Sequence, residues 1–177
     1  MVTPPDLDGL LKRLEGKIPA HCILTRAEDT RPYECDGLSL YRELPPMVIL
    51  PEDESQVIEV VQACKAFDVP IVPRGAGTGL SGGATPHPRG VLLGVSKLNR
   101  ILEINPESAT AIVEPGVRNL AISEAAAAVG LYYAPDPSSQ IACSIGGNIA
   151  ENSGGVHCLK YGLTIHNVLR ARVVTMD

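Results

Sequence analysis

The chain has 177 residues, of which 45% are hydrophobic, so it can form one large domain or two small ones around a real core. Only 3% of the residues are aromatic and the formal net charge is -5, which argues against nucleic-acid binding, because that function calls for basic faces and stacking rings. No apolar run reaches the roughly 18 residues of a membrane span, and the acidic, proline-containing N-terminus is unlike a signal peptide. We therefore expect an intracellular protein without a transmembrane segment.

A helix is predicted near the N-terminus, in the stretch "PPDLDGLLKRLEG" at residues 4–16. Proline and acidic residues begin it, Gly16 ends it, and leucines recur along one face. Residues 18–46 contain no clear pattern beyond a turn around "CDG". Residues 1–45 are therefore treated as an N-terminal helix and an irregular segment.

A compact βαβ unit is predicted next. The apolar run "MVILP" at 47–51 is typical of a strand, and "EDESQVIEVVQACKAFDVP" at 52–70 has acids first and then apolar residues at helical spacing. The brief run "VPIVP" at 69–73 predicts a second buried strand. This strand leads directly into a glycine-rich loop.

Beyond that loop the pattern changes. Three short runs at 90–98, 100–106 and 109–116 predict strands of a meander rather than further βαβ units. An alanine-rich helix is predicted over 117–130, ending at Gly130. The last run, "NVLRARVVTMD" at 167–177, predicts a final strand.

The loop "PRGAGTGLSGGA" at 73–84 contains five glycines. Three of them satisfy G-x-G-x-x-G, but a Rossmann turn must open a helix, and Pro86 and Pro88 prevent one here. A Walker lysine is also missing, since Gly83 stands in its place. Glycine allows successive backbone N–H groups to point into one concavity, so we expect bare backbone to bind an anionic group, with Thr78 and Ser81 adding hydroxyl donors. The alternative is that these glycines only form a sharp turn.

A second glycine-rich region follows at 132–162, "YYAPDPSSQIACSIGGNIAENSGGVHCLKYG". It contains a predicted paired-glycine turn at 146–147 and a cluster of serine and asparagine residues. Two such regions, about 60 residues apart, are suited to hold the two ends of a dinucleotide.

The five cysteines form no CxxC pair and are odd in number, which is typical of reduced thiols in the cytosol. The adjacent His157 and Cys158 have no partners at ligand spacing. We therefore predict no metal site. Cys143, within the second glycine-rich region, is expected to be a small buried thiol.

Three stretches carry a specific resemblance: "PRGAGTGLSGGA", "YYAPDPSSQIACSIGGNIAENSGGVHCLKYGLTIHNV" and "YECDGLSLYR" at 33–42. They resemble the FAD-binding domain of the vanillyl-alcohol-oxidase (PCMH-type) flavoprotein family, and within it the D-subunit type of bacterial glycolate oxidases and related D-2-hydroxyacid dehydrogenases. The resemblance implies an α+β fold, with a FAD-binding PCMH-type domain at 46–177. Its two α+β subdomains would cover about 46–100 and 101–177. A substrate-binding cap domain is expected outside this chain.

The resemblance also implies which residues bind FAD. The first loop would hold the pyrophosphate, through Arg74, Gly75, Ala76, Gly77, Thr78, Gly79, Ser81 and Gly82. One wall of the cofactor channel would be formed by Pro135, Asp136, Pro137, Ser138 and Ser139. The rest of the cofactor would contact Cys143, Gly146, Gly147, Asn148, Asn152, Ser153, Gly154 and Gly155, with Tyr161 and Gly162 near the same cleft. Because the first loop has no histidine, we expect the FAD to be non-covalent.

The implied activity is oxidation of glycolate, or a related small 2-hydroxy acid, by a flavin-dependent dehydrogenase. Electrons would pass to partner subunits, one of them carrying iron–sulfur clusters, in the cytoplasm or at the inner face of the membrane. We predict no catalytic residue in this chain, because the base and the carboxylate clamp are expected in the cap domain. The chain alone is expected to bind FAD weakly and to be inactive. A D-lactate dehydrogenase, another FAD-linked oxidase of the family and a non-catalytic module remain alternatives.

Overall fold

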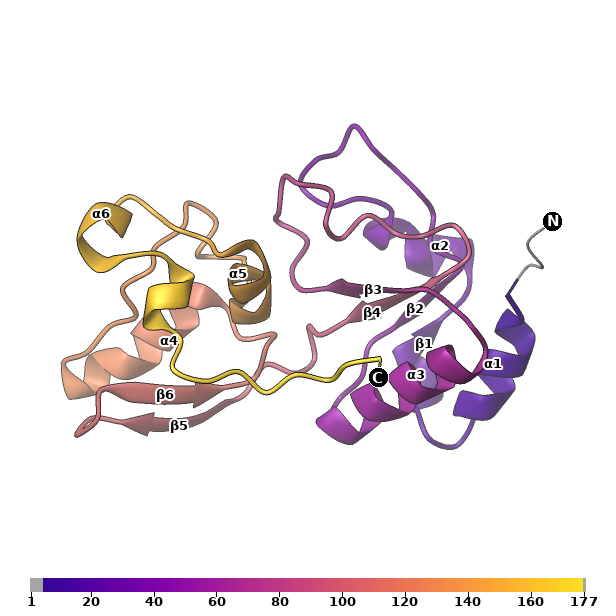
Figure 1. Cartoon of the computed structure of the whole chain (residues 1–177), viewed down its shortest axis with the longest axis horizontal. Helices are drawn as coiled ribbons and strands as arrows, with labels where there is room; N and C mark the ends of the chain where they lie inside the picture. Colours follow the sequence, from indigo (N-terminus) through magenta and orange to yellow (C-terminus); the bar gives the residue numbers. More distant parts are fainter. Residues whose placement is uncertain (1–4, 177) are drawn as a thin grey trace. The chain divides into compact units, whose positions relative to one another are not determined.

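The computed structural model describes residues 5–176, and both helices and sheets are found in this range (Figure 1). The predicted α+β class is therefore confirmed. The chain divides into two compact units: the first reaches to Lys97 and includes a short C-terminal segment from Val173, and the second is Leu98–Arg172. Residues 1–4 of the predicted N-terminal segment (1–45) and Asp177, the last residue of the predicted final strand, lie outside the described range.

A four-stranded sheet forms the centre of the first unit. Its order is β1 (Ile23–Leu24), β2 (Met47–Ile49), β4 (Val91–Gly94) and β3 (Ile71–Arg74). The strands β2, β4 and β3 are parallel, and β1 is antiparallel to β2. The prediction that the run at 90–98 begins a meander is wrong, because β4 lies between the two strands of the βαβ unit.

Two helices pack on one face of this sheet, and both begin where the sequence predicts (Figure 1). Asp6 caps α1 (Leu7–Leu14) and accepts a hydrogen bond from the Gly9 N–H at 2.8 Å. Asp53 caps α3 (Glu54–Ala66) and accepts one from the Gln56 N–H at 2.9 Å. Such caps satisfy N–H groups that have no partner inside the helix.

The two faces of the sheet carry separate cores. Buried side chains of α1 and α3 meet the alternate strand residues Met47, Ile49, Val91 and Leu93. On the other face, Val48, Leu50 and Leu92 pack with Leu24 and Tyr33. The segment at 20–33, which the sequence left irregular, contains the 3-10 helix η1 (Ala20–Cys22), the short helix α2 (Ala27–Thr30) and the 3-10 helix η2 (Arg31–Tyr33).

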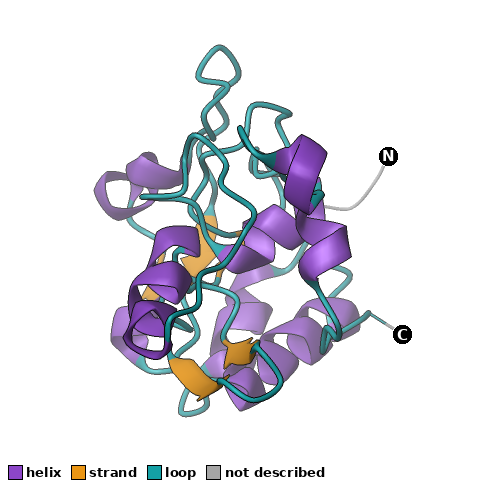
Figure 2. Ribbon diagram, turned by 90° about the vertical axis from the view of Figure 1, so that its left-hand side faces the viewer, coloured by secondary structure: helices purple, strands orange, loops and turns teal. Residues whose placement is uncertain are grey.

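The second unit combines a hairpin with short helices (Figures 1 and 2). The strands β5 (Ile101–Asn105) and β6 (Thr110–Val113) pair antiparallel, as predicted, and α4 (Asn119–Ala126) continues into η3 (Ala127–Val129) before Gly130. Three more helices follow: α5 (Ile145–Glu151), α6 (Cys158–Tyr161) and the 3-10 helix η4 (Thr164–Asn167). The core of this unit is formed by Val117, Ile122 and Ile145.

Two predictions for the second unit are wrong. Gly146 and Gly147 do not form a turn, since they lie in the first turn of α5 behind the N-cap Ser144. The predicted final strand is extended coil over 168–176 without ladder pairing in the described range. Its apolar alternation fits a strand, but a strand also needs a partner for its backbone groups.

A charged pair joins the two ends of the hairpin. Arg100 donates to the Glu114 carboxylate through its backbone N–H at 2.7 Å and through its guanidinium Nη2 at 2.6 Å. The Glu114 side chain is only 10% exposed. The hydrogen bonds from the Arg100 side chain hold the pKa of Glu114 below its ordinary value.

The Glu114→Gln substitution is expected to lower the free energy of unfolding by about 1–2 kcal/mol at neutral pH. Because the pKa of Glu114 is lowered in the folded chain, its contribution is present above pH 4.5 and is lost as the pH falls through the folded value. The difference between the two proteins should therefore shrink near pH 3. Denaturant unfolding at both pH values measures it. The exposed Glu103 of the same hairpin gives the control: Glu103→Gln should change little at either pH.

Candidate functional site

The predicted cofactor residues divide between the two units. Those from Arg74 to Gly82 lie in the first unit, and those from Pro135 to Gly162 lie in the second. A cavity of about 490 Å³ is lined by residues between Leu11 and Thr25 and by Gln56. None of the predicted cofactor residues lines it.

The first glycine-rich loop leaves the carboxyl end of β3 and returns to β4 with no helix in between (Figure 1). Ligands of open parallel sheets bind outside the carboxyl ends of the strands. Within the described part of the chain, no backbone N–H from Gly75 to Leu80 donates a hydrogen bond. A run of such N–H groups is suited to an anion.

The buried side chain of Arg74 packs between the glycine-rich loop and residues 33–35. It is 9% exposed, its Nη1 donates to the Cys35 carbonyl at 2.8 Å, and its guanidinium lies 5.7 Å from the centre of the Tyr33 ring. Burial lowers the pKa of the Arg74 guanidinium, which nevertheless stays charged. Gly77 has φ +70°, and a Cβ at this position would overlap Nη2 and Cζ of Arg74. Glycine is therefore required at position 77 on two separate grounds.

The segment around Gly37 also shapes the loop, a role that the residue patterns did not assign. A Cβ on Gly37 would lie 2.8 Å from the Gly79 carbonyl oxygen and 3.0 Å from that of Thr78. Asp36 is buried, its Oδ1 accepts from the Leu38 N–H at 2.8 Å, and its Oδ2 has no partner in the described range. The signal was the "YECDGLSLYR" stretch, which supported the resemblance without being given a role in the site.

In the second unit, Asp136 holds the "SGG" segment in place. Its Oδ1 accepts from the His157 backbone N–H at 3.2 Å, and its Oδ2 lies 2.6 Å from His157 Nδ1. The contact with the His157 side chain lowers the pKa of Asp136. A Cβ on Gly155 would overlap the carbonyl oxygen and Oδ1 of Asp136, so this glycine permits the close approach. The structure thus brings the predicted residues of "PDPSS" and "NSGG" together.

The start of α5 contains one residue with an unused donor. Asn148 is 2% exposed, and its Nδ2 has no hydrogen-bond partner among the described residues. An unpaired buried amide is costly, so such a group is suited to donate to a ligand. Gly146, by contrast, packs against Pro115 and donates its N–H to the Pro115 carbonyl at 2.8 Å. This contact gives Gly146 a packing role.

Several predicted residues after the start of α5 form hydrogen bonds or ring contacts within the second unit. Asn152 adopts φ +50° and accepts from the Ile165 N–H at 3.0 Å, and the Ser153 carbonyl accepts from Thr164 Oγ1 at 2.7 Å. The Tyr161 ring packs edge-on against Tyr132, with 6.1 Å between ring centres. Gly162 has φ +80°, which favours glycine. Cys143 is a buried free thiol, as expected.

A family model described as a FAD binding domain matches residues 45–177. The chain belongs to this family. FAD is therefore its cofactor, and the residues present fit it: the first loop offers unpaired backbone donors, and Asn148 offers a buried amide. The predicted FAD-binding resemblance is confirmed.

Relatives of two kinds, glycolate oxidase subunits and a D-2-hydroxyglutarate dehydrogenase, are similar to this chain. Glycolate oxidase subunit GlcD of Escherichia coli strain K12 is 58% identical over 175 residues, which cover 98% of this chain and 35% of that protein. The subunit of the same name from Bacillus subtilis is 44% identical over 80% of this chain and 30% of that protein. D-2-hydroxyglutarate dehydrogenase of Stutzerimonas stutzeri is 33% identical over 94% of this chain and 36% of that protein. The chain spans about a third of the length of these relatives.

Solved structures share the fold of the FAD-binding domain at low identity. An alkyldihydroxyacetonephosphate synthase matches with a TM-score of 0.81 at 20% identity, covering 92% of this chain and 32% of that one. p-Cresol methylhydroxylase with substrate bound matches with a TM-score of 0.74 at 22% identity, covering 83% and 30%. The PCMH-type fold predicted from the resemblance is thus confirmed.

Proposed function

We propose that this FAD-binding domain belongs to a flavin-dependent 2-hydroxyacid dehydrogenase whose substrate is glycolate. The observation that carries the proposal is the 58% identity over 98% of the chain with a protein named as a glycolate oxidase subunit. The relatives named D-2-hydroxyglutarate dehydrogenase are 33% and 35% identical, and the one named D-lactate dehydrogenase is 33% identical. Glycolate would be oxidised to glyoxylate.

Each unit carries its own group of proposed cofactor residues. We propose that the N–H groups from Gly75 to Leu80 bind the pyrophosphate and that Asn148 Nδ2 donates to another acceptor of FAD. Asp136 would position Gly155 and the backbone beside it. Bound FAD would supply the hydride acceptor. The base that takes the hydroxyl proton and the cation that clamps the carboxylate are proposed to lie in a cap domain outside this chain.

Non-covalent binding is supported by the state of the nearby nucleophiles. His157 Nδ1 faces Asp136, and His166 Nδ1 accepts from the Leu163 N–H at 3.0 Å. Cys143 is buried, and the first loop contains no histidine. Attachment of the flavin through Nδ1 of either histidine would break one of these contacts.

The relatives named as subunits support a multi-subunit assembly. We propose that electrons leave the flavin for a partner subunit that carries iron–sulfur clusters. None of the helices in the described part of the chain combines the length and hydrophobicity of a membrane span. We propose a cytoplasmic location, with any contact with the inner face of the membrane made through partner subunits.

The test is turnover by the full-length protein with an artificial electron acceptor. With bound FAD, it should oxidise glycolate with a kcat/KM at least about tenfold above that for D-lactate or D-2-hydroxyglutarate, a difference of about 1.4 kcal/mol in transition-state binding. A preference for D-lactate would replace the proposed substrate. A folded protein without flavin colour, and without a response to added FAD, would favour the non-catalytic module. FMN and NAD serve as controls for cofactor choice.

A further inference from the structure

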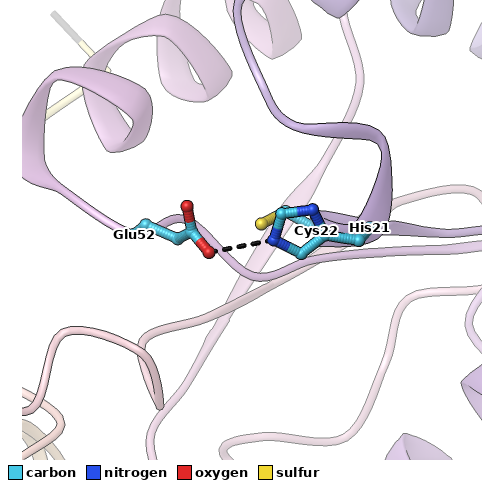
Figure 3. A group of neighbouring side chains, drawn as sticks. All are labelled: His21, Cys22 and Glu52. Carbon is cyan, nitrogen blue, oxygen red and sulfur yellow. Dashed lines mark hydrogen bonds and ion pairs between the residues drawn. The ribbon is translucent and has the colours of Figure 1, made fainter.

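A cluster of metal-ligating side chains lies in the first unit and includes none of the proposed cofactor residues. His21 and Cys22 are adjacent on η1, and Glu52 lies between β2 and α3 (Figure 3). One ligand atom from each of the three residues lies within 4.8 Å of the other two. His21 Nε2 is 3.0 Å from Glu52 Oε1. Imidazole, thiolate and carboxylate together form a donor set typical of zinc.

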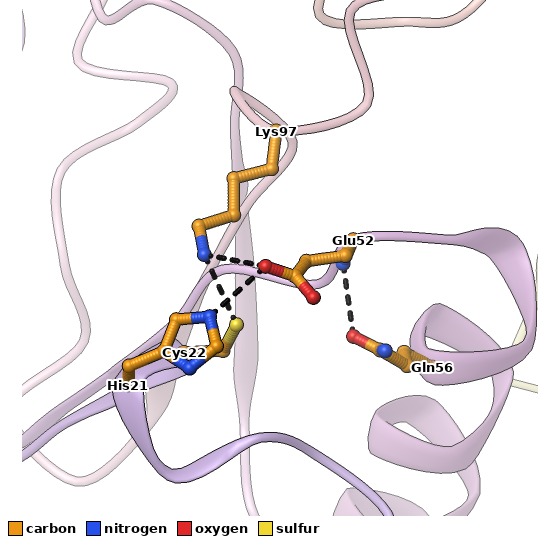
Figure 4. A network of polar contacts seen from close by, with 5 residues as sticks. All are labelled: His21, Cys22, Glu52, Gln56 and Lys97. Carbon is orange, nitrogen blue, oxygen red and sulfur yellow. Dashed lines mark hydrogen bonds and ion pairs between the residues drawn. The ribbon is translucent and has the colours of Figure 1, made fainter.

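An ammonium group already sits among these ligand atoms. Lys97 Nζ lies 2.9 Å from Glu52 Oε1 and 3.2 Å from Cys22 Sγ (Figure 4). The ammonium is thus held by the Glu52 carboxylate and faces the Cys22 sulfur. The position among the three side chains is therefore one that favours a positive charge.

The cluster has a buried inner side and an exposed outer side. Cys22 is fully buried, whereas the side chains of His21 and Glu52 are 67% and 42% exposed. Lys97, with a 31% exposed side chain, can withdraw its flexible stem into solvent. The Glu52 backbone is held by its N–H, which donates to Gln56 Oε1 at 2.9 Å (Figure 4). Ligand atoms of a tetrahedral zinc site lie about 3.3–3.8 Å apart, so the exposed side chains need only a small closing movement.

We propose that His21, Cys22 and Glu52 bind a divalent metal ion of the zinc class in place of the Lys97 ammonium. The ligand atoms are His21 Nε2, Cys22 Sγ and a Glu52 carboxylate oxygen, with water in the fourth position. On binding, the Cys22 thiol releases its proton to solvent, and Lys97 keeps its proton and moves outward. Lys97 thus competes with the metal ion for the site.

Cobalt(II) titration of the purified protein tests the site without any flavin readout. One equivalent of Co²⁺ should give thiolate-to-cobalt charge-transfer absorption, and Zn²⁺ should remove it. Cys22→Ser should abolish this absorption. Cys64→Ser is the control, because Cys64 is another buried free cysteine, outside the cluster, whose thiol pKa is raised to about 12 by burial. Absence of the band in the wild type, or its survival in Cys22→Ser, would overturn the proposal.

Two further variants, with one control, distinguish loss of the site from a folding defect. His21→Gln changes an exposed side chain and should weaken Co²⁺ binding by at least about tenfold, since losing even an outer-shell partner costs 10–100-fold. His87→Gln, outside the cluster, should not. Lys97→Met should tighten binding by about tenfold or more because it removes the competing cation. Unchanged affinity in His21→Gln, or no gain in Lys97→Met, in a protein with unaltered circular dichroism would each contradict the assignment.

Discussion

Replacing Gly77 with alanine is expected to weaken FAD binding by about 100-fold or more. The added Cβ would overlap the buried guanidinium of Arg74, and φ +70° is strained for any residue with a Cβ. Either Arg74 leaves its bond to Cys35 or the loop moves, and both displace the run of free N–H groups. Titration with FAD, followed by flavin absorption and fluorescence, measures the loss.

Gly16 provides the matched control for this substitution. It has φ +75° in the same unit, but nothing lies within 4 Å of the position of its Cβ. Gly16→Ala should therefore cost about 1–2 kcal/mol of stability through backbone strain alone and leave FAD affinity unchanged. If Gly77→Ala bound FAD as tightly as Gly16→Ala, the loop would not be a main-chain cradle.

Substituting Asn148 with leucine is expected to separate cofactor binding from folding. Its buried Nδ2 has no partner in the described part of the chain, so an apolar side chain of similar size should leave the stability of the cofactor-free chain unchanged or raise it. FAD affinity should fall by about 10- to 100-fold because a buried donor to the ligand is lost. Denaturant unfolding without FAD and FAD titration give the two numbers.

The substitution Asn119→Leu is the matched control for Asn148→Leu. Asn119 is equally buried, and although its Oδ1 has no partner in the described range, its Nδ2 donates to the Pro135 carbonyl at 3.0 Å. Asn119→Leu should therefore destabilise the cofactor-free chain by about 1–3 kcal/mol, since it strands a buried carbonyl. A loss of stability in Asn148→Leu as large as that in Asn119→Leu would show that Asn148 serves the fold rather than the cofactor.

The sequence predicted best those elements whose signals are local. Acidic residues were predicted to begin the first two helices, and the structure shows Asp6 and Asp53 as their caps. Gly16 and Gly130 lie at helix ends, as predicted. The absence of a helix after the glycine-rich loop was likewise predicted from two nearby prolines, Pro86 and Pro88. Each of these features depends on residues only a few positions apart.

Features that depend on distant partners were missed. The β4 strand is buried along its whole length because it has parallel neighbours on both sides, and the continuous apolar run "VLLG" was the available signal. Gly146 and Gly147 read as a turn, but the close approach of Pro115 and the cap by Ser144 start a helix there. In the site, Arg74 faces Cys35 and Tyr33, a contact that no sequence spacing indicates.

Because β4 lies beside β3 in the sheet, the length of the glycine-rich loop that joins them has little effect on how the two strands pair. The loop joins two adjacent parallel strands, and its entropy of closure grows slowly, by only about 0.6 kcal/mol for each doubling of length. Loop closure therefore constrains the length of this connection weakly, whereas the proposed binding of the pyrophosphate by several consecutive N–H groups would constrain it residue by residue. We therefore expect insertions or deletions between Gly75 and Leu80 to change the entropy of loop closure little and to disturb the proposed contacts with the cofactor strongly, so the length of the loop would be set by the cofactor more than by the sheet.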